Sequence, residues 1–211
     1  MTDDLERTRP HGPSPRSPLG GRPGTAAKRA QILDAATAVF GEKGYVHGTL
    51  ADVADRVGLT RAGVLHHFGS KDQLLMAVLR HRDDGDVERL AEKHLPGGSE
   101  LFRHLVATAV ANESRPGLVQ TYVVLSAESV TADHPARTYF EERYASLRTI
   151  LGESLSGLCA ERGITDPVVV ERASASMLAV MDGMQTQWLL APDSVGLAET
   201  TAWAIEAILR A

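Results

Sequence analysis

The sequence has a single cysteine, Cys159, so the chain cannot form a disulfide within itself and has no cysteine cluster that could hold a metal. It also lacks any apolar run near the ~20 residues that are needed to span a bilayer. Its N-terminus has no apolar segment behind the charges, as a signal peptide would have. These absences predict a cytoplasmic protein without a membrane partner.

Residue patterns that are typical of enzymes are missing as well. The sequence contains no H-x-x-x-H pair, no G-x-S-x-G and no glycine-rich phosphate loop followed by Lys and Ser or Thr. Asp83, Asp84 and Asp86 resemble part of a calcium loop, but the spaced glutamate is absent, which favours a solvated acidic turn. We therefore expect no catalytic residues, no metal, no cofactor and no enzyme activity.

Residues 49–74 instead carry the pattern of two short helices joined by a tight turn. Thr49 can cap the first helix, with Asp52 placed three residues later as in a capping box. Gly58 follows the last apolar position, where a helix commonly ends with a positive φ. Thr60 can cap a second helix over residues 61–67. This order of caps and turn predicts a helix-turn-helix, although a plain helical hairpin in a core would share part of it.

The charge distribution agrees with nucleic-acid binding by this part of the chain. The formal net charge of the whole chain is −5, which alone argues weakly against a nucleic-acid partner. Residues 1–82, however, hold 12 Lys and Arg against 8 Asp and Glu, whereas residues 83–211 hold 10 against 19. The basic part contains the helix-turn-helix and can therefore approach phosphates while the acidic part stays away.

Proline, glycine and helical periodicity divide the chain into parts. Residues 1–24 contain five prolines and four arginines and little that could pack, which predicts a disordered arm. This arm is either an inert tail or a segment that lies along the DNA minor groove. The predicted fold is all-α, with a helix-turn-helix domain (25–70), a connecting helix (70 to about 84) and a C-terminal helical domain (85–211). Besides the short helix after Thr49 and the helix at 61–67, the expected helices span residues 26–43, 70–84, 100–112, 116–130, 133–162, 166–190 and 194–210.

Residues 28–80 resemble the DNA-binding domain of tetracycline-repressor (TetR) family regulators. The resemblance rests on Gly44-Tyr45, Thr49, Val53-Ala54, Gly58-Leu59-Thr60 and His67-Phe68-x-Ser70-Lys71-x-x-Leu74. It implies a three-helix domain followed by a connecting helix, with Thr49, Thr60 and Lys71 at positions that usually hold phosphate. The family usually has a tyrosine where this chain has Leu65, which cannot form a hydrogen bond but can touch a thymine methyl group.

The second helix of the motif is the expected recognition helix. Its N-terminal part meets base edges in such proteins, and Arg61 at its start can bond a guanine in a bidentate manner. His66 can reach a base or a phosphate, and Gly63 would let the backbone approach closely. The expected DNA-contacting residues are Thr49, Thr60, Arg61, Ala62, Gly63, Leu65, His66, His67 and Lys71.

The C-terminal part is expected to bind a small molecule, because TetR-type proteins usually enclose one within this domain. Methionine adapts to irregular apolar cavities, and histidine or tyrosine can supply polar anchors. The candidate ligand-binding residues are Phe102, His104, Tyr122, Tyr144, Met177 and Met181, and an ordinary role in the core is the alternative for each. The identity of the ligand does not follow from the sequence.

The last two expected helices carry apolar stripes and small residues that would permit close helix approach. By resemblance, these helices pair with those of a second copy in a homodimer, while a core within one chain is the alternative. The expected interface residues are Met184, Trp188, Thr201, Ile205 and Ile208. A two-fold symmetric dimer would read a palindromic operator in double-stranded DNA.

The predicted function is a ligand-responsive, sequence-specific DNA-binding regulator, a repressor that a small molecule releases from its operator. The alternative is a helical small-molecule-binding protein whose helix-turn-helix binds DNA weakly or not at all. Leu65 and the low positive charge of the motif keep this alternative open.

Overall fold

The computed structural model describes residues 23–91 and 99–210, and every element in these two ranges is an α-helix. This confirms the all-α prediction. The helices are α1 (Pro23–His47), α2 (Leu50–Arg56), α3 (Arg61–Phe68), α4 (Lys71–Ala91), α5 (Ser99–Glu113), α6 (Pro116–Glu128), α7 (Arg137–Glu161), α8 (Pro167–Leu190) and α9 (Leu197–Arg210). None of the described helices has the length and apolarity that crossing a bilayer requires.

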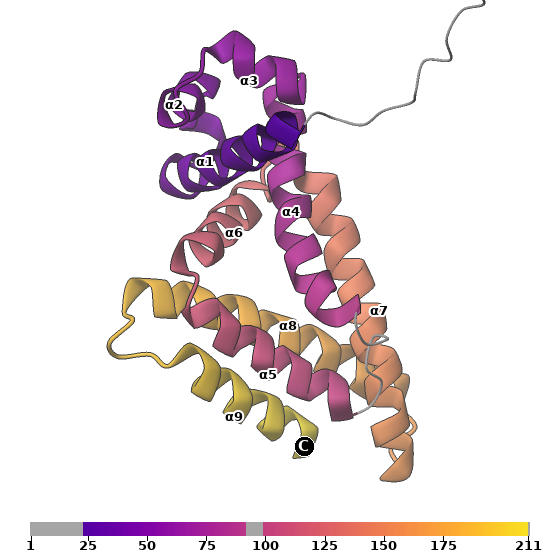
Figure 1. Cartoon of the computed structure of the whole chain (residues 1–211). Helices are drawn as coiled ribbons and strands as arrows, with labels where there is room; N and C mark the ends of the chain where they lie inside the picture. Colours follow the sequence, from indigo (N-terminus) through magenta and orange to yellow (C-terminus); the bar gives the residue numbers. More distant parts are fainter. Residues whose placement is uncertain (1–22, 92–98, 211) are drawn as a thin grey trace, which may run out of the picture.

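The short helices α2 and α3 lie with α1 at one end of the molecule, and α4 leads from them to the larger helical part (Figure 1). Helix α6 packs beneath α1, and α7 follows the direction of α4. Helices α5, α8 and α9 form layers at the opposite end, where α5 contacts α9 and α8 contacts both α7 and α9. The helix-turn-helix and α1 are therefore joined to the larger part through both α4 and α6.

The first core is shared between the N-terminal helices and the larger helical part. On α1, the inward positions Ile32, Val39 and Phe40 are fully buried, as the helical spacing predicts. The core does not end at α4, because side chains of α6 and α7 belong to it. Its principal members are Ile32, Ala36, Val39, Phe40, Leu50, Val53, Ala54, Val64, Phe68, Leu74, Leu75, Val78, Leu79, Tyr122, Leu125, Ala136 and Phe140.

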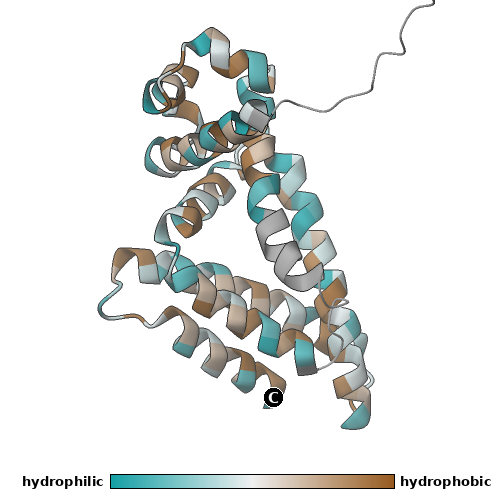
Figure 2. Cartoon of the chain, in the orientation of Figure 1, coloured by the Kyte–Doolittle hydropathy of each residue, from teal (hydrophilic) through white to brown (hydrophobic). Residues whose placement is uncertain are grey.

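A second and a third core hold the larger helical part together. The second lies between α5, α7, α8 and α9 and contains Leu101, Phe102, Leu151, Leu155, Met177, Leu178 and Ile205. The third lies between α5, α6, α8 and the start of α9 and contains Ala109, Val119, Trp188 and Leu197. Helix α9 is coloured mainly in apolar and intermediate tones (Figure 2), and its Trp203 side chain is 71% exposed.

The connecting helix is longer than the sequence predicts. It begins at Lys71 but runs to Ala91, through the acidic segment at 83–86 that was expected to end or bend it near residue 84. A glycine inside a helix is unfavourable by only ~1 kcal/mol relative to alanine, so this segment does not suffice to end α4. The segment Leu95-Pro96-Gly97-Gly98-Ser99 also predicts a boundary in the sequence, and all of it except Ser99 lies outside the described residues.

Other helix ends also differ from the prediction. Helix α1 begins at Pro23, so residues 23 and 24 belong to it and not to the expected arm, of which residues 1–22 lie outside the described residues. Helix α7 begins at Arg137 and not at Asp133, because Asp133 has a φ of 64° and His134 accepts a hydrogen bond from the Ala136 backbone within a turn. Helix α9 begins at Leu197, three residues after the expected start.

Candidate nucleic-acid interface and internal cavity

Helix α2 is held by the capping box that the sequence predicts. The Asp52 amide donates to the Thr49 hydroxyl oxygen (3.1 Å), and the Thr49 amide donates to the Asp52 carboxylate (2.8 Å). The Thr49 hydroxyl itself donates to the same carboxylate (2.7 Å), so its proton is engaged within the motif. Lys43 also pairs with Asp52 (2.6 Å), and these bonds hold the pKa of that carboxyl far below its usual value.

The turn between α2 and α3 has the expected glycine conformation, with a φ of 64° at Gly58. The Thr60 hydroxyl then caps α3 by accepting from the Gly63 amide (3.1 Å). Val64 and Phe68 hold the inner face of α3 in the first core. This leaves Arg61, Ala62 and His66 exposed on the outer face.

Two expected recognition-helix residues are less exposed than their neighbours. Leu65 is half-buried and packs against the first core, so only part of its side chain is available to contact DNA. His67 is half-buried too, and its carbonyl oxygen accepts from the Arg29 guanidinium (2.5 Å). That guanidinium also lies 4.0 Å from the centre of the Phe68 ring. Arg29 therefore fixes the end of α3 to α1, a role that the sequence reading missed because the two segments are far apart in the chain.

Lys71, a predicted phosphate contact, already has neighbours within the chain. Its ammonium lies 4.3 Å from the centre of the Tyr45 ring and donates to the Val46 carbonyl (3.5 Å). Partial burial lowers the pKa of Lys71, although nearby carboxylates oppose the shift. The Tyr45 hydroxyl in turn bonds to Asp72, so the start of α4 is tied to the segment that follows α1.

Helices α1 and α6 are joined by a series of hydrogen bonds. The Thr121 hydroxyl donates to the Thr37 carbonyl (2.8 Å), and the Gln120 side-chain carboxamide donates to the Gly41 carbonyl (3.1 Å). At the end of α6, the Glu128 carboxylate accepts from the Tyr45 amide (2.6 Å).

The close approach of α6 requires glycine at two positions of α1. A Cβ at Gly41 would overlap Thr121, and a Cβ at Gly44 would overlap the Glu128 carboxylate. Gly44 also has a φ of 69°, so an L side chain there would be strained as well.

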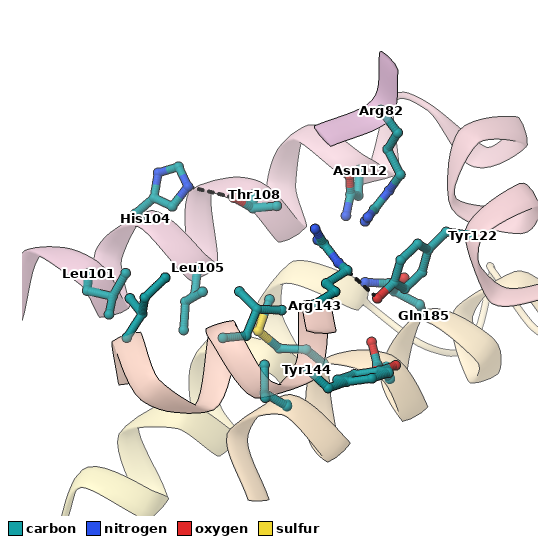
Figure 3. Close-up of a pocket in the computed structure, with 15 residues that line it drawn as sticks. Arg82, Leu101, His104, Leu105, Thr108, Asn112, Tyr122, Arg143, Tyr144 and Gln185 are labelled. Carbon is teal, nitrogen blue, oxygen red and sulfur yellow. Dashed lines mark hydrogen bonds between the residues drawn. The ribbon is translucent and has the colours of Figure 1, made fainter. Parts of the chain in front are cut away.

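An internal cavity of about 130 Å³ lies between α4, α5, α6, α7 and α8 (Figure 3). Its lining combines apolar and polar side chains. The apolar ones are Leu101, Leu105, Leu147, Ile150, Leu178 and Met181, and the polar or charged ones are Arg82, His104, Thr108, Asn112, Tyr122, Arg143, Tyr144, Asp182 and Gln185.

At the polar end, two guanidinium groups flank one phenol ring. Arg82 lies 3.7 Å and Arg143 5.5 Å from the centre of the Tyr122 ring, and Arg143 donates to the Tyr122 hydroxyl (3.3 Å). The Tyr144 hydroxyl donates to Asp182 (2.5 Å). Burial raises the pKa of Asp182, while the bond from Tyr144 and the two arginines oppose that shift.

The cavity contains four of the six residues that the sequence reading placed in a ligand site, namely His104, Tyr122, Tyr144 and Met181. The other two, Phe102 and Met177, are buried in the second core. Arg82, Arg143, Asp182 and Gln185 were not among the residues predicted from the sequence. Helical spacing could have revealed three of these four, because Arg82 continues the Leu75–Val78 stripe, and Asp182 and Gln185 continue that of Leu178.

Most of the expected dimer-interface residues are buried within the chain. Trp188, Thr201 and Ile205 are at most 9% exposed, and Met184 and Ile208 are half-buried. Met184 and Trp188 pack in the third core, and Ile205 and Ile208 pack in the second, so these side chains contribute to a core within the chain. Four other large apolar side chains of α8 and α9 are exposed, Leu190 (82%) and Trp203 (71%) most of all.

Comparison with known proteins assigns both parts of the chain. Residues 32–78 match the family model described as "Bacterial regulatory proteins, tetR family", and residues 99–211 match the "BetI-type transcriptional repressor, C-terminal" model. The chain is 30% identical to the probable HTH-type transcriptional regulator ArpR of Pseudomonas putida, over 80% of this chain and 83% of that protein. It is 31% identical to the HTH-type transcriptional regulator BetI of Paraburkholderia phytofirmans, over 77% and 80%.

A solved structure has the same fold. SmeT, the repressor of the Stenotrophomonas maltophilia multidrug efflux pump SmeDEF, aligns with a TM-score of 0.67 at 20% identity, over 88% of this chain and 90% of its own. Another structure of SmeT is a complex with triclosan.

Proposed function

Because the chain belongs to the tetR family of bacterial regulatory proteins, a non-enzymatic family of ligand-responsive DNA-binding repressors, we propose how its residues divide that task. Helix α3 reads the operator, the cavity receives the effector, and α4 and α6 connect the two. One observation carries this proposal: the cavity wall includes Arg82 of α4 and Tyr122 of α6, the two helices that join the larger part to the DNA-binding helices.

The DNA-reading role of α3 is supported by which of its side chains remain free of the core. Arg61 is exposed at the start of the helix, where such a helix contacts base edges. Ala62 and His66 share the exposed face, while Thr49 and Thr60 stabilise the helix starts and can present their oxygens toward the phosphate backbone. Lys71 reaches a phosphate only if its ammonium leaves the Tyr45 ring.

The proposed coupling between the cavity and α3 follows from the contacts around the cavity. Tyr122 is adjacent to Thr121, which bonds to α1, and Arg82 stacks on Tyr122 from α4. A ligand that separates Arg82 from Tyr122 therefore displaces α4 relative to α6 and changes the placement of α3. The ligand can shift this equilibrium only by its difference in affinity between the two arrangements, typically ~1–3 kcal/mol.

A homodimer through the outer faces of α8 and α9 completes the proposal. Ala175, Ala179, Leu190, Trp203 and Ala207 are exposed there, and small side chains on α8 permit close helix approach. The two-fold axis would place the α3 helices ~34–36 Å apart, or at a multiple of that distance, so the operator is a palindrome.

A binding selection over random duplexes tests the proposal. The expected result is an enriched palindrome of about 14–20 base pairs, a length set by the half-site spacing. Arg61→Ala should weaken operator binding by ~1–3 kcal/mol and relax one position in each half-site, whereas the control Arg80→Ala on the exposed side of α4 should leave the motif unchanged. The absence of any enriched motif at moderate salt would refute the DNA-reading role.

A further inference from the structure

A buried hydrogen-bonding group on the cavity lining has no partner within the described residues. Gln185 of α8 lines the cavity and is 6% exposed, and its Oε1 atom accepts no hydrogen bond. Figure 3 shows this side chain beside Arg143 and Tyr122. A buried carbonyl oxygen is costly to leave unpaired. A hydrogen-bond donor on a ligand therefore gains more at Gln185 than at an exposed carbonyl.

The lining around Gln185 suits an apolar group that carries such a donor. Leu178 and Met181 lie seven and four residues before Gln185, so the three side chains share one face of α8. Leucine and isoleucine side chains of α5 and α7 complete the apolar lining. Burial of an apolar group against these side chains is favourable. This face of α8 therefore offers an apolar contact and a hydrogen-bond acceptor within one helical turn.

The volume of the cavity limits the ligand to about one six-membered ring. The cavity measures about 130 Å³, and an apolar cavity of roughly 150 Å³ in another protein holds one benzene molecule. A hydroxyl group adds little to the volume of such a ring. Because a hydroxyl group both donates and accepts, it can pair with the Gln185 carboxamide in either of its two orientations.

The charged groups of the lining already act on one another, so they do not require a charge on the ligand. Burial raises the pKa of Asp182, and the positive charges of Arg82 and Arg143 both oppose that rise. Arg143 also donates to the Tyr122 hydroxyl (3.3 Å). A charged ligand would lose its hydration inside the protein, and this loss costs far more than that of a neutral polar group. The lining therefore favours a neutral ligand.

We propose that the effector is a neutral single-ring compound of phenol size, whose hydroxyl group donates a hydrogen bond to the Gln185 side chain. The ring lies on the apolar lining next to Leu178 and Met181. This inference rests on the proposed role of the cavity as the effector site. It adds that Gln185 determines which ligands the cavity prefers, because an apolar ligand of equal size leaves its oxygen unpaired.

Calorimetric titration of the full-length protein with phenol and toluene tests the role of Gln185. The two probes have the same number of non-hydrogen atoms, and only phenol can donate a hydrogen bond from a hydroxyl group. Gln185→Leu should lower the ratio of phenol affinity to toluene affinity by about tenfold or more. The hydration of each probe is the same in every titration, so it cancels when these ratios are compared. Gln187→Leu makes the same change at an exposed position of α8 and should leave the ratio unchanged.

Gln185→Met provides a second variant with an unbranched side chain of similar length, and it should lower the ratio in the same way. Benzamide and benzoate, which have nearly the same shape, test the charge of the ligand on the parent protein at neutral pH. Benzamide should bind about tenfold more tightly or better, because it carries no charge into the cavity. An unchanged phenol-to-toluene ratio in both variants, or tighter binding of benzoate than of benzamide, would overturn the proposed ligand class.

Operator binding by the protein without effector is measured separately, because it does not depend on the ligand class. If the operator is bound but the phenol-to-toluene ratio does not respond to residue 185, the ligand class is refuted and the regulator function stands. If phenol binds with the expected ratio but does not release the operator, the proposed coupling of the cavity to α3 is refuted instead.

Discussion

Replacing Trp203 by alanine should dissociate the proposed dimer without unfolding the subunit. Trp203 is 71% exposed on α9, while its neighbours Thr201 and Ile205 on the other face are 1% and 2% exposed. The substitution therefore leaves the second core of each subunit intact. It removes the largest exposed apolar side chain from the face that we assign to the partner subunit.

The size of the effect follows from the area involved. A tryptophan carries roughly 250 Å², so a 71% exposed side chain presents about 180 Å² to its surroundings. If about half of this area is buried in the dimer, each tryptophan contributes about 2 kcal/mol at ~25 cal/mol per Å². Two-fold symmetry places two such side chains in the interface, and about 4 kcal/mol corresponds to about a thousandfold change in the dimer dissociation constant.

Sedimentation equilibrium over a range of protein concentrations measures this constant directly. Val130→Ala is the control, because Val130 is also strongly exposed (75%) but follows α6, away from α8 and α9. Far-UV circular dichroism of both variants establishes that the helices are retained. The reasoning is wrong if Trp203→Ala remains as dimeric as the parent, or if Val130→Ala weakens the dimer to the same extent.

Three further predictions concern the DNA-binding helices and their junction. Gly44→Ala should lower the free energy of unfolding in urea by about 1–3 kcal/mol, because residue 44 has a positive φ and the new Cβ would overlap the Glu128 carboxylate. The control Gly117→Ala should be tolerated, because a Cβ at residue 117 meets no neighbouring atom. Burial lowers the pKa of His134 below the usual 6.5, so the unfolded chain binds more protons. The free energy of unfolding should therefore fall as the pH drops below about 6.5, and His134→Gln should flatten this dependence. Lys71→Ala should weaken binding evenly across DNA sequences and lower the salt slope by about one for each subunit, or about two for the dimer; an unchanged slope would mean that the ammonium stays on Tyr45 in the complex.

Local signals in the sequence predicted the DNA-binding motif in detail. Thr49, Gly58 and Thr60 act through neighbours three to five residues away, so their caps and turn can be recognised without knowledge of the tertiary structure. The same local reasoning failed at residues 83–86, because an acidic and glycine-containing segment only lowers helix propensity and does not forbid a helix.

The polar wall of the cavity could not be predicted with the same certainty. Arg82 and Gln185 are buried only because α4, α6, α7 and α8 converge on them, and such convergence is a property of tertiary packing. Helical periodicity likewise identified the apolar stripes on α8 and α9, but it did not indicate which elements they pack against. Trp188 and Ile205 pack within the chain, and Trp203 lies on the opposite side.

The shared first core limits how regulators of this kind can be recombined. Val78 and Leu79 of α4 pack in the same core as Leu125 of α6 and Phe140 of α7. A chimera that keeps α1–α4 and joins them to another effector domain would expose that apolar surface, even though the helix-turn-helix ends well before the junction. A functional exchange would have to transfer the matching parts of α6 and α7 together with α1–α4, so the unit of modular design is larger than the sequence motif.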